Sequence, residues 1–488
     1  MVTSTYSLTV DWDGNGTPED DIAADVLSIT CSRGRDYASQ LTGRAKAGTL
    51  TAMLRNEDGR YSPFLTTGPL YGTLLPGRKV ILKADDGGGA TTLWTGFVDT
   101  ITPVSTSATP QAELRCTGPL RKLTSRRVPV AASSGAATGT LIDNVLDAID
   151  WPAGDRDTDT GQTTTGAWFI EDKDALTAIR ELEDTELGFV YEGLAYDVAF
   201  RNRHYRLLTA SSLTSQATFS DASATQPYTS IEEQDPLRDI YNVAKATIRT
   251  YTTAAEAVLW TLNETPVLPA GASRIWWAEP SDLNTLYVAL WTTPVVGTDV
   301  TQTGVANGDI AVAVSKFARS MKITVTNNHA ALPATLTLVQ AKGTAVTLND
   351  QTSVNVEDAT SQTAYGERSY ALPAKWLAST NEAQDYCDYI VGRYKDPHPV
   401  VAITWVANRN AAAMTTALDL AINNRVTVTA TGARTKLGIN EDFYIEAIAH
   451  RIRPREHSVT IELSPVSGEG GYWILGTSTL GVDTKLGY

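Results

Sequence analysis

An acidic loop near the N-terminus contains residue types that could bind a cation. In "DWDGNGTPEDD", Asp11, Asp13 and Asn15 alternate and Gly16 follows, as in the first half of a calcium loop. A hand-like loop also needs a bidentate acid at its twelfth position, where this chain has Ile22. Asp, Asn and Gly also form turns that bind their own backbone. We therefore expect a turn joining the first two strands, with a looser calcium loop as the alternative, and no metal or cofactor.

Other residues that could carry catalysis are few. Among the five histidines, His450 and His457 could face each other across a hairpin, but no cysteine or paired carboxylate lies near them in sequence. The motifs of serine hydrolases, zinc proteases and nucleotide-binding enzymes are absent from the sequence. A predicted helix carries a dense set of acids, typical of a solvated helix face. These acids are Glu181, Glu183, Asp184 and Glu186. We therefore expect a protein that is not an enzyme.

The chain has 488 residues, a formal charge of −15 and three cysteines. This length predicts several domains. The acidic charge argues against a nucleic-acid-binding surface, and it would let DNA pass without adhering. The N-terminus lacks the basic start and apolar core of a secretory signal, and no apolar run reaches membrane-spanning length. We therefore expect synthesis in a cytoplasm and no membrane insertion by this chain.

The elements that position these residues are mostly strands. Short alternating runs rich in Thr, Val and Ile, separated by Gly, Pro, Asn and Asp, predict a mainly β fold with a small α+β part. "GTLTAMLRNEDGRYSPF" (48–64) predicts a hairpin with its turn at 57–59. Ser379 followed by Glu382 forms a capping box that begins a helix over 379–394.

The expected architecture has two tube-like β-barrel modules in one chain, an α+β domain and an inserted β-sandwich. The expected boundaries are 1–125 for the N-terminal barrel module, 126–235 for the α+β domain, 236–250 with 360–466 for the second barrel module, 251–359 for the sandwich and 467–488 for a C-terminal docking tail.

The two barrel modules share a faint internal repeat. A strand near Leu50 precedes "GRKVILKA", "LWTGFVDTI" and "QAELRCTG", and "VVAITWVA" precedes "NRVTVTAT", "FYIEAIAHRI" and "HSVTIELS". In this alignment Arg78 matches Arg425 and Trp94 matches Tyr444. A chain with two copies of one unit can replace two subunits of a ring. The alternative is that any two sets of Greek-key strands look alike at this level.

The C-terminal segment, "GEGGYWILGTSTLGVDTKLGY", combines Gly, Ser and Thr with spaced apolar residues. Such a tail cannot bury these groups alone, so it either drapes over its own protein or docks on a neighbour. We expect docking. The predicted partner-docking residues are Trp473, Ile474, Leu475, Leu480, Leu486 and Tyr488.

Several stretches resemble the N-terminal module of siphophage and prophage tail hub proteins, relatives of the contractile-phage baseplate hub. They include "AGTLTAMLRNEDGRYSPF", "GPLYGTLLPGRKVIL" and "LWTGFVDTI", and the resemblance continues in "EAQDYCDYIVGRYKDPHPVV", "EDFYIEAIAHRI" and "WILGTSTLG". The sandwich over 251–359 is the least diagnostic part. No single motif is catalytic, so the resemblance depends on the order and number of these stretches.

The resemblance implies a homotrimer whose six barrel modules form a pseudo-sixfold ring at the distal end of the tail tube. Its expected partners are the distal tail protein or tail tube on one face and a tip or central fibre protein bound through the C-terminal tail. The tape measure protein and DNA would pass through the lumen without sequence-specific binding. The expected location is the tail tip of the virion, and we expect no lysin domain.

Two other functional classes stay open. A receptor- or carbohydrate-binding tail protein would place exposed rows of aromatic residues on the sandwich. A polysaccharide-degrading tail enzyme would need two carboxylates about 5 to 10 Å apart in a cleft.

Overall fold

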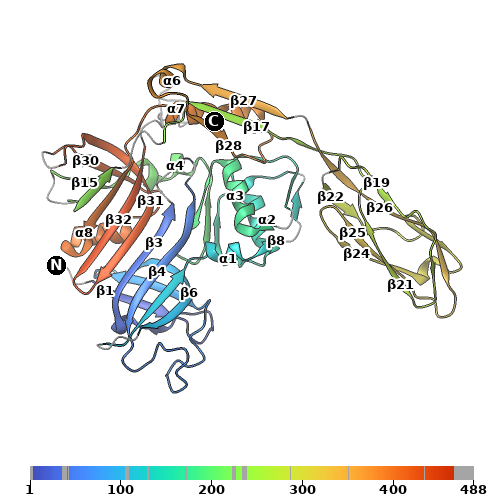
Figure 1. The fold of residues 1–488 in the computed structure, drawn as a ribbon, viewed down its shortest axis with the longest axis horizontal. Coiled ribbons are helices and arrows are strands. Elements are labelled where there is room, and N and C mark those ends of the chain that lie inside the picture. Colours follow the sequence, from blue (N-terminus) through green and yellow to red (C-terminus); the bar gives the residue numbers. More distant parts are fainter. Residues whose placement is uncertain are drawn as a thin grey trace.

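The computed structural model describes residues 4–35, 41, 43–104, 109–128, 131–133, 135–170, 173–222, 227–233, 239–285, 287–349, 351–432 and 435–466. Two β-barrel modules lie side by side at one end of the molecule, an α+β domain packs against them, and a β-sandwich projects from the other end (Figure 1). The mainly β fold class expected from the sequence is confirmed. No described helix is long and apolar enough to cross a bilayer.

The N-terminal barrel module is built from strands whose buried and exposed residues alternate. The alternation is regular in β5, which buries Val80, Leu82 and Ala84 and turns the residues between them outward. The strands run in the order β3-β4-β7-β6-β5-β1-β2. They are β1 (Thr5–Val10), β2 (Asp20–Asp21), β3 (Val26–Arg35), β4 (Ala45–Arg55), β5 (Lys79–Asp85), β6 (Ala90–Val104) and β7 (Gln111–Thr117).

The hairpin expected over 48–64 is wrong. The turn is present, since the Gly59 amide donates to the Asn56 carbonyl and Gly59 has φ 72°. No strand follows it, however, and β4 pairs with β3 and β7 instead. Residues 56–75 form a chain of consecutive turns, anchored by the buried Tyr61, whose hydroxyl donates to Asp25. The turn residues therefore indicated the turn correctly, but the partners of β4 are the preceding strand and the distant β7.

The C-terminal barrel module continues the same sheet. Strand β31 pairs with β3, so the strands of both modules form one 13-stranded sheet in the described chain. One hydrophobic cluster, containing Leu50 and Ile461, runs through both modules. The elements are β15 (Ser215–Ser220), β16 (Ser230–Glu233), β29 (Val401–Val406), α8 (Ala411–Asp419), β30 (Arg425–Ala430), β31 (Ile439–Arg453) and β32 (Glu456–Pro465).

The two modules repeat one unit of four strands. The order β4-β7-β6-β5 in the first corresponds to β29-β32-β31-β30 in the second, and every pair is antiparallel in both. The copies also share two irregularities. Asp99 and Glu446 are each the extra residue of a β-bulge against the closing strand. Gly77 has a φ of 82° and Asn423 a φ of 71°. The amide of each donates to the carbonyl of the residue just before the bulge, which is Val98 in the first module and Ile445 in the second.

These shared irregularities correct the residue alignment drawn from the sequence. Counted from the bulges, Arg425 corresponds to Lys79 rather than to Arg78, and Tyr444 corresponds to Phe97 rather than to Trp94. The strand order of the repeat was right. The residue match was wrong, because side-chain similarity between strands does not fix the register.

The α+β domain packs its helices and small sheets around a separate core. Helix α2 buries Leu141, Ile142, Val145 and Leu146, which the helical period places on one face. Its elements are α1 (Leu120–Thr124), β8 (Arg127–Val128), β9 (Ala131–Ser133), α2 (Thr138–Ala148), β10 (Arg156–Thr158), β11 (Trp168–Ile170), β12 (Lys173–Asp174), α3 (Ala175–Glu186), β13 (Phe189–Glu192), β14 (Val198–Arg201), α4 (Tyr205–Leu208) and α5 (Ala210–Leu213).

Two strands expected in the α+β domain lie elsewhere. β15 pairs with β30 and β16 pairs with β29, so both belong to the second barrel sheet. Conversely, β17 (Val243–Ile248), which was assigned to that barrel, pairs with β27 (Thr352–Glu357) and β28 (Ser369–Leu372) in a small separate sheet. Helix α7 (Thr380–Tyr394) covers this sheet, with Ser379 accepting from the Glu382 amide as the capping box predicts, and α6 (Ala359–Tyr365) precedes β28.

The projecting sandwich has two sheets around one core (Figure 1). Long strand β26 pairs with five shorter strands in one sheet, and β25 is flanked by two in the other. The strands are β18 (Tyr251–Thr253), β19 (Ala257–Thr261), β20 (Val267–Leu268), β21 (Ser273–Ala278), β22 (Tyr287–Thr292), β23 (Val300–Thr303), β24 (Ile310–Lys316), β25 (Met321–Asn327) and β26 (Ala334–Leu348).

Candidate functional site at the junction of the barrel modules

The two barrel modules meet where β3 pairs with β31. Residues 29–34 of β3 lie opposite residues 452–447 of β31. At Gly34 the strands approach so closely that an added Cβ would lie 2.3 Å from the Glu446 carbonyl oxygen and 2.6 Å from the Ala447 Cα. Gly34 also has φ 118°, which a residue with a side chain rarely adopts. Only glycine therefore permits this junction beside the bulge at Glu446.

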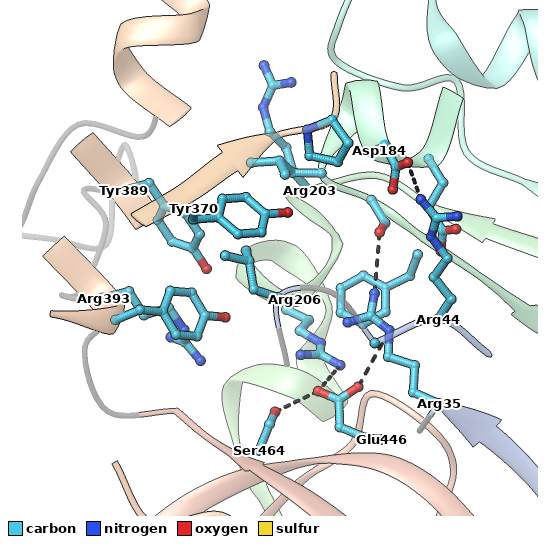
Figure 2. A pocket seen from close by; sticks show the side chains of 18 of the residues that line it. Arg35, Arg44, Asp184, Arg203, Arg206, Tyr370, Tyr389, Arg393, Glu446 and Ser464 are labelled. Atoms are coloured by element: carbon cyan, nitrogen blue, oxygen red, sulfur yellow. Dashed lines mark hydrogen bonds and ion pairs between the residues drawn. The ribbon is translucent and has the colours of Figure 1, made fainter. Parts of the chain in front are cut away.

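The bulge turns the Glu446 side chain inward, to a buried position among cations. One carboxylate oxygen accepts from the Ser464 hydroxyl at 2.6 Å and forms an ion pair with Arg206 at 2.9 Å, and the other lies 4.0 Å from Arg35 (Figure 2). Burial alone would raise the pKa of Glu446, but Arg206 and Arg35 outweigh it and hold that pKa below its usual value. Glu446 is thus a buried anion held by two guanidinium groups.

A phenyl ring completes this arrangement, which we call the junction cluster: Arg35, Phe189, Arg206, Glu446 and Ser464. The guanidinium carbons of Arg35 and Arg206 lie 3.4 and 4.1 Å from the centre of the Phe189 ring. Arg35 comes from the first barrel, Phe189 and Arg206 from the α+β domain, and Glu446 and Ser464 from the second barrel. The cluster therefore joins three parts of the chain at one point.

A cavity of about 210 Å³ opens beside the junction cluster (Figure 2). Arg44 lies against Asp184 on one side, and Arg393 of α7 donates to the Pro465 carbonyl at 2.6 Å on the other. Burial raises the pKa of Asp184 to about 6, although Arg44 acts against the shift. Since each of these charged groups is bound to a partner in the fold, we interpret the lining as a brace between domains rather than as a reaction centre.

The acids of α3 are not the solvated face that the sequence suggested. Glu183 is buried, pairs with Arg180 and accepts from the Val190 amide at 2.7 Å. Glu186 is fully buried and accepts from the Thr138 hydroxyl and from the amides of residues 162 and 163. The expectation was wrong because β13, α2 and the loop at 162–163 supply hydrogen-bond donors that the helix sequence does not reveal. These carboxylates hold the α+β domain together.

His450 and His457 do face each other, and they extend the contact between the modules. His450 Nδ1 lies 3.0 Å from His457 Nε2, and His457 Nδ1 lies 3.0 Å from the hydroxyl of Tyr6 in the first barrel. Burial is the main cause that lowers the pKa of both histidines, to about 4 for His457. In the described residues no group of three His, Cys, Asp or Glu side chains could hold a metal ion. The pair is a neutral buried link.

The acidic N-terminal loop is the predicted turn. The Asp11 carboxylate accepts from the amides of Gly14, Asn15 and Gly16 at 2.8 to 3.0 Å, and the Asn15 carbonyl oxygen accepts from the Thr17 amide. Gly14 and Gly16 both have positive φ. The loop joins β1 to β2, so its polar groups satisfy its own backbone.

The predicted partner-docking residues cannot be placed. Trp473, Ile474, Leu475, Leu480, Leu486 and Tyr488 lie outside the described residues. In the sandwich, Trp276 and Trp291 are buried in the core, whereas Trp277 is exposed and its ring centre lies 5.5 Å from that of Phe317. The junction cluster was not predicted at all, although Glu446 is a lone acid in the otherwise apolar run "FYIEAIA".

No family model matches the chain, and no curated protein matches it in sequence. Solved structures do match. The 43 kDa tail protein of prophage MuSo2 from Shewanella oneidensis is 11% identical with a TM-score of 0.52, and the match covers 95% of this chain and 98% of that one. A tail protein from Neisseria meningitidis MC58 is 9% identical with a TM-score of 0.51, covering 94% and 96%. The resemblance drawn from the sequence is confirmed at the level of architecture: the chain has the fold of prophage tail proteins.

Proposed function

We propose that the chain is a structural tail hub protein of a phage or prophage. Three copies form a pseudo-sixfold ring at the distal end of the tail tube, and the ring is part of the DNA ejection channel. The observation that carries this proposal is the duplicated barrel unit with its matching bulges at Asp99 and Glu446. Two equivalent modules per chain let three chains present six similar units to a sixfold tube.

The brace at the junction fits this role. A ring at a tube end must keep its two modules in a fixed orientation, and the junction cluster ties both barrels to the α+β domain through Glu446. The acidic composition also fits a channel, because three chains of −15 carry −45 and would not hold DNA. The ring would contact the distal tail protein or tail tube on one face, in the virion tail tip.

Mass measurement of the purified chain tests this proposal. Light scattering or native mass spectrometry should give three times the chain mass, and images of tail particles should show six similar lobes around the channel. A chain that stays monomeric at high concentration, together with tail particles that lack such a ring, would contradict the hub proposal.

The C-terminal tail is proposed to recruit the tip or central fibre protein. Deleting residues 468–488 should leave the fold and the trimer intact and abolish co-assembly with the next tip protein, as measured by co-purification from tail particles. Trp277→Ala, which removes an exposed aromatic side chain of the sandwich, is the matched control and should leave co-assembly unchanged. If the truncated chain fails to fold, the tail belongs to a core and the docking proposal is wrong.

The carbohydrate-binding alternative has one supporting observation, the exposed pair of Trp277 and Phe317 on the sandwich. The same Trp277→Ala variant distinguishes it, because loss of adsorption to host cells with unchanged tail assembly would favour that alternative.

A further inference from the structure

The duplication implies which surface of one copy meets the next. Inside the chain, the part of β31 after its bulge pairs with β32 on one side and with β3 on the other. The equivalent part of β6, Thr100–Val104, pairs with β7, and no described strand pairs with its other side. Thr100, Thr102, Pro103 and Val104 are exposed. The edge that joins the modules in one barrel therefore has no described partner strand in the other.

The strand equivalent to β3 is open as well. In the first module, Thr51 pairs with Arg115, and Arg115 pairs with the residue just after the bulge of β6. In the second module, Ala402 pairs with Glu462, and Glu462 pairs with the residue just after the bulge of β31. Thr51 and Ala402 are therefore equivalent positions. β3 places Thr30 opposite Thr51, and β16 places Glu232 opposite Ala402, both in antiparallel pairs. β16 is thus the counterpart of β3. It is the terminal strand of the large sheet, and among described strands it pairs only with β29.

We propose that the end of β6 in one copy, Pro103 and Val104, pairs with β16 of a second copy, with Glu233 and Glu232 opposite them in the antiparallel register of β31 with β3. This inference rests on the proposed hub ring and names the contact that closes it. The two edges are different surfaces, so the contact is head-to-tail and generates a ring when the rotation closes. In a trimer the barrel modules would alternate, and every neighbouring pair would meet through the same kind of strand junction.

The proline at position 103 is consistent with a strand edge that pairs with one specific partner. It corresponds to His450, since each is the fourth residue after its bulge. Proline is tolerated on edge strands, and an edge that carries proline resists pairing with unrelated chains. Because proline has no amide hydrogen, the contact between copies would have fewer hydrogen bonds than the junction inside the chain. The ring would then separate into intact chains before the modules separate from each other.

The register gives a precise cross-linking test. Val104 is the fifth residue after its bulge and corresponds to Arg451, which lies opposite Thr30. Val104 of one copy should therefore face Glu232 of the next. Cβ atoms of directly opposite residues lie about 4.5 to 5.5 Å apart, near disulfide range, whereas diagonal neighbours lie about 7 to 8 Å apart. The chain carrying both Val104→Cys and Glu232→Cys should form disulfide-linked trimers under mild oxidation, and reduction should return them to single chains on a denaturing gel.

Three controls define the result. Val104→Cys and Glu232→Cys alone should give no covalent trimers, and Thr102→Cys with Glu232→Cys should give far fewer. If the double cysteine variant is trimeric by mass but does not cross-link, the proposed edge contact is wrong and the proposed trimer is unaffected. If the wild-type chain is monomeric, both the edge contact and the trimer are wrong. If the cysteine variant does not fold, hydrogen exchange of the wild-type trimer decides. Protection of the amides of Val104, Glu232 and Glu233 that is lost on dilution to monomer supports the contact, and rapid exchange of these amides in the trimer overturns it.

Discussion

Replacing Glu446 with glutamine is expected to destabilise the paired barrels by about 3 to 5 kcal/mol. The side chain keeps its size, but Arg35 and Arg206 lose the buried anion between them. Removing one partner of a buried ion pair leaves the other charge in a site without water, which costs more than an exposed pair would. Urea unfolding of the wild type and the Glu446→Gln variant, followed by tryptophan fluorescence, measures the change.

Glu456→Gln is the matched control for this prediction. It removes a carboxylate from the same hairpin of β31 and β32, but Glu456 is exposed, so we expect a change within about 0.5 kcal/mol. Equal stability of the two variants would mean that the guanidinium groups find other partners, and that the junction cluster is not the brace we infer. The same comparison made on trimers would show whether loss of the brace also loosens the ring.

Acid is expected to weaken the contact between the modules through His450 and His457. Both have a pKa in the folded chain below that of an unfolded histidine, about 6.5, so below this pH the unfolded chain binds protons that the folded chain excludes. The free energy of unfolding should therefore fall as the pH drops from 6.5 towards 4. For His457 alone the loss should reach about 3 kcal/mol near pH 4.

The groups that face the two histidines support this predicted fall in stability with falling pH. Arg33 adds to the lowering of the His450 pKa, and on the other side Tyr6 is a neutral phenol whose pKa burial raises to about 12. Urea titrations from pH 7 to pH 4 should show a smaller loss of stability for His457→Gln than for the wild type. Equal slopes for both chains would show that the pair does not titrate with unfolding.

The features predicted correctly are those set by neighbouring residues. The turn at Asp11 depends on carboxylate and amide groups within five positions of each other. The cap at Ser379 depends on a residue three positions later, and the inward face of α2 depends on helical periodicity. The repeat of four strands was visible as an order of runs, because alternation and turn residues define each strand locally.

The features that were wrong or missed depend on contacts between distant segments. The sequence does not show that β15 and β16 leave the α+β domain for the second barrel, because pairing between strands that lie about 170 to 210 residues apart has no local signal. The acids of α3 looked solvated because their partners, such as Thr138, come from other elements.

The sequence by itself determined that this is a mainly β chain in which two sets of strands follow the same order, since local alternation and turn chemistry are enough to define strands and their order. Only the tertiary structure decided that Glu446 is a buried anion, that Gly34 lies against the backbone of β31, and that no described strand pairs with one edge of β6 after its bulge. The physical reason is that burial, charge pairing and strand register arise only when segments far apart in the chain are brought together.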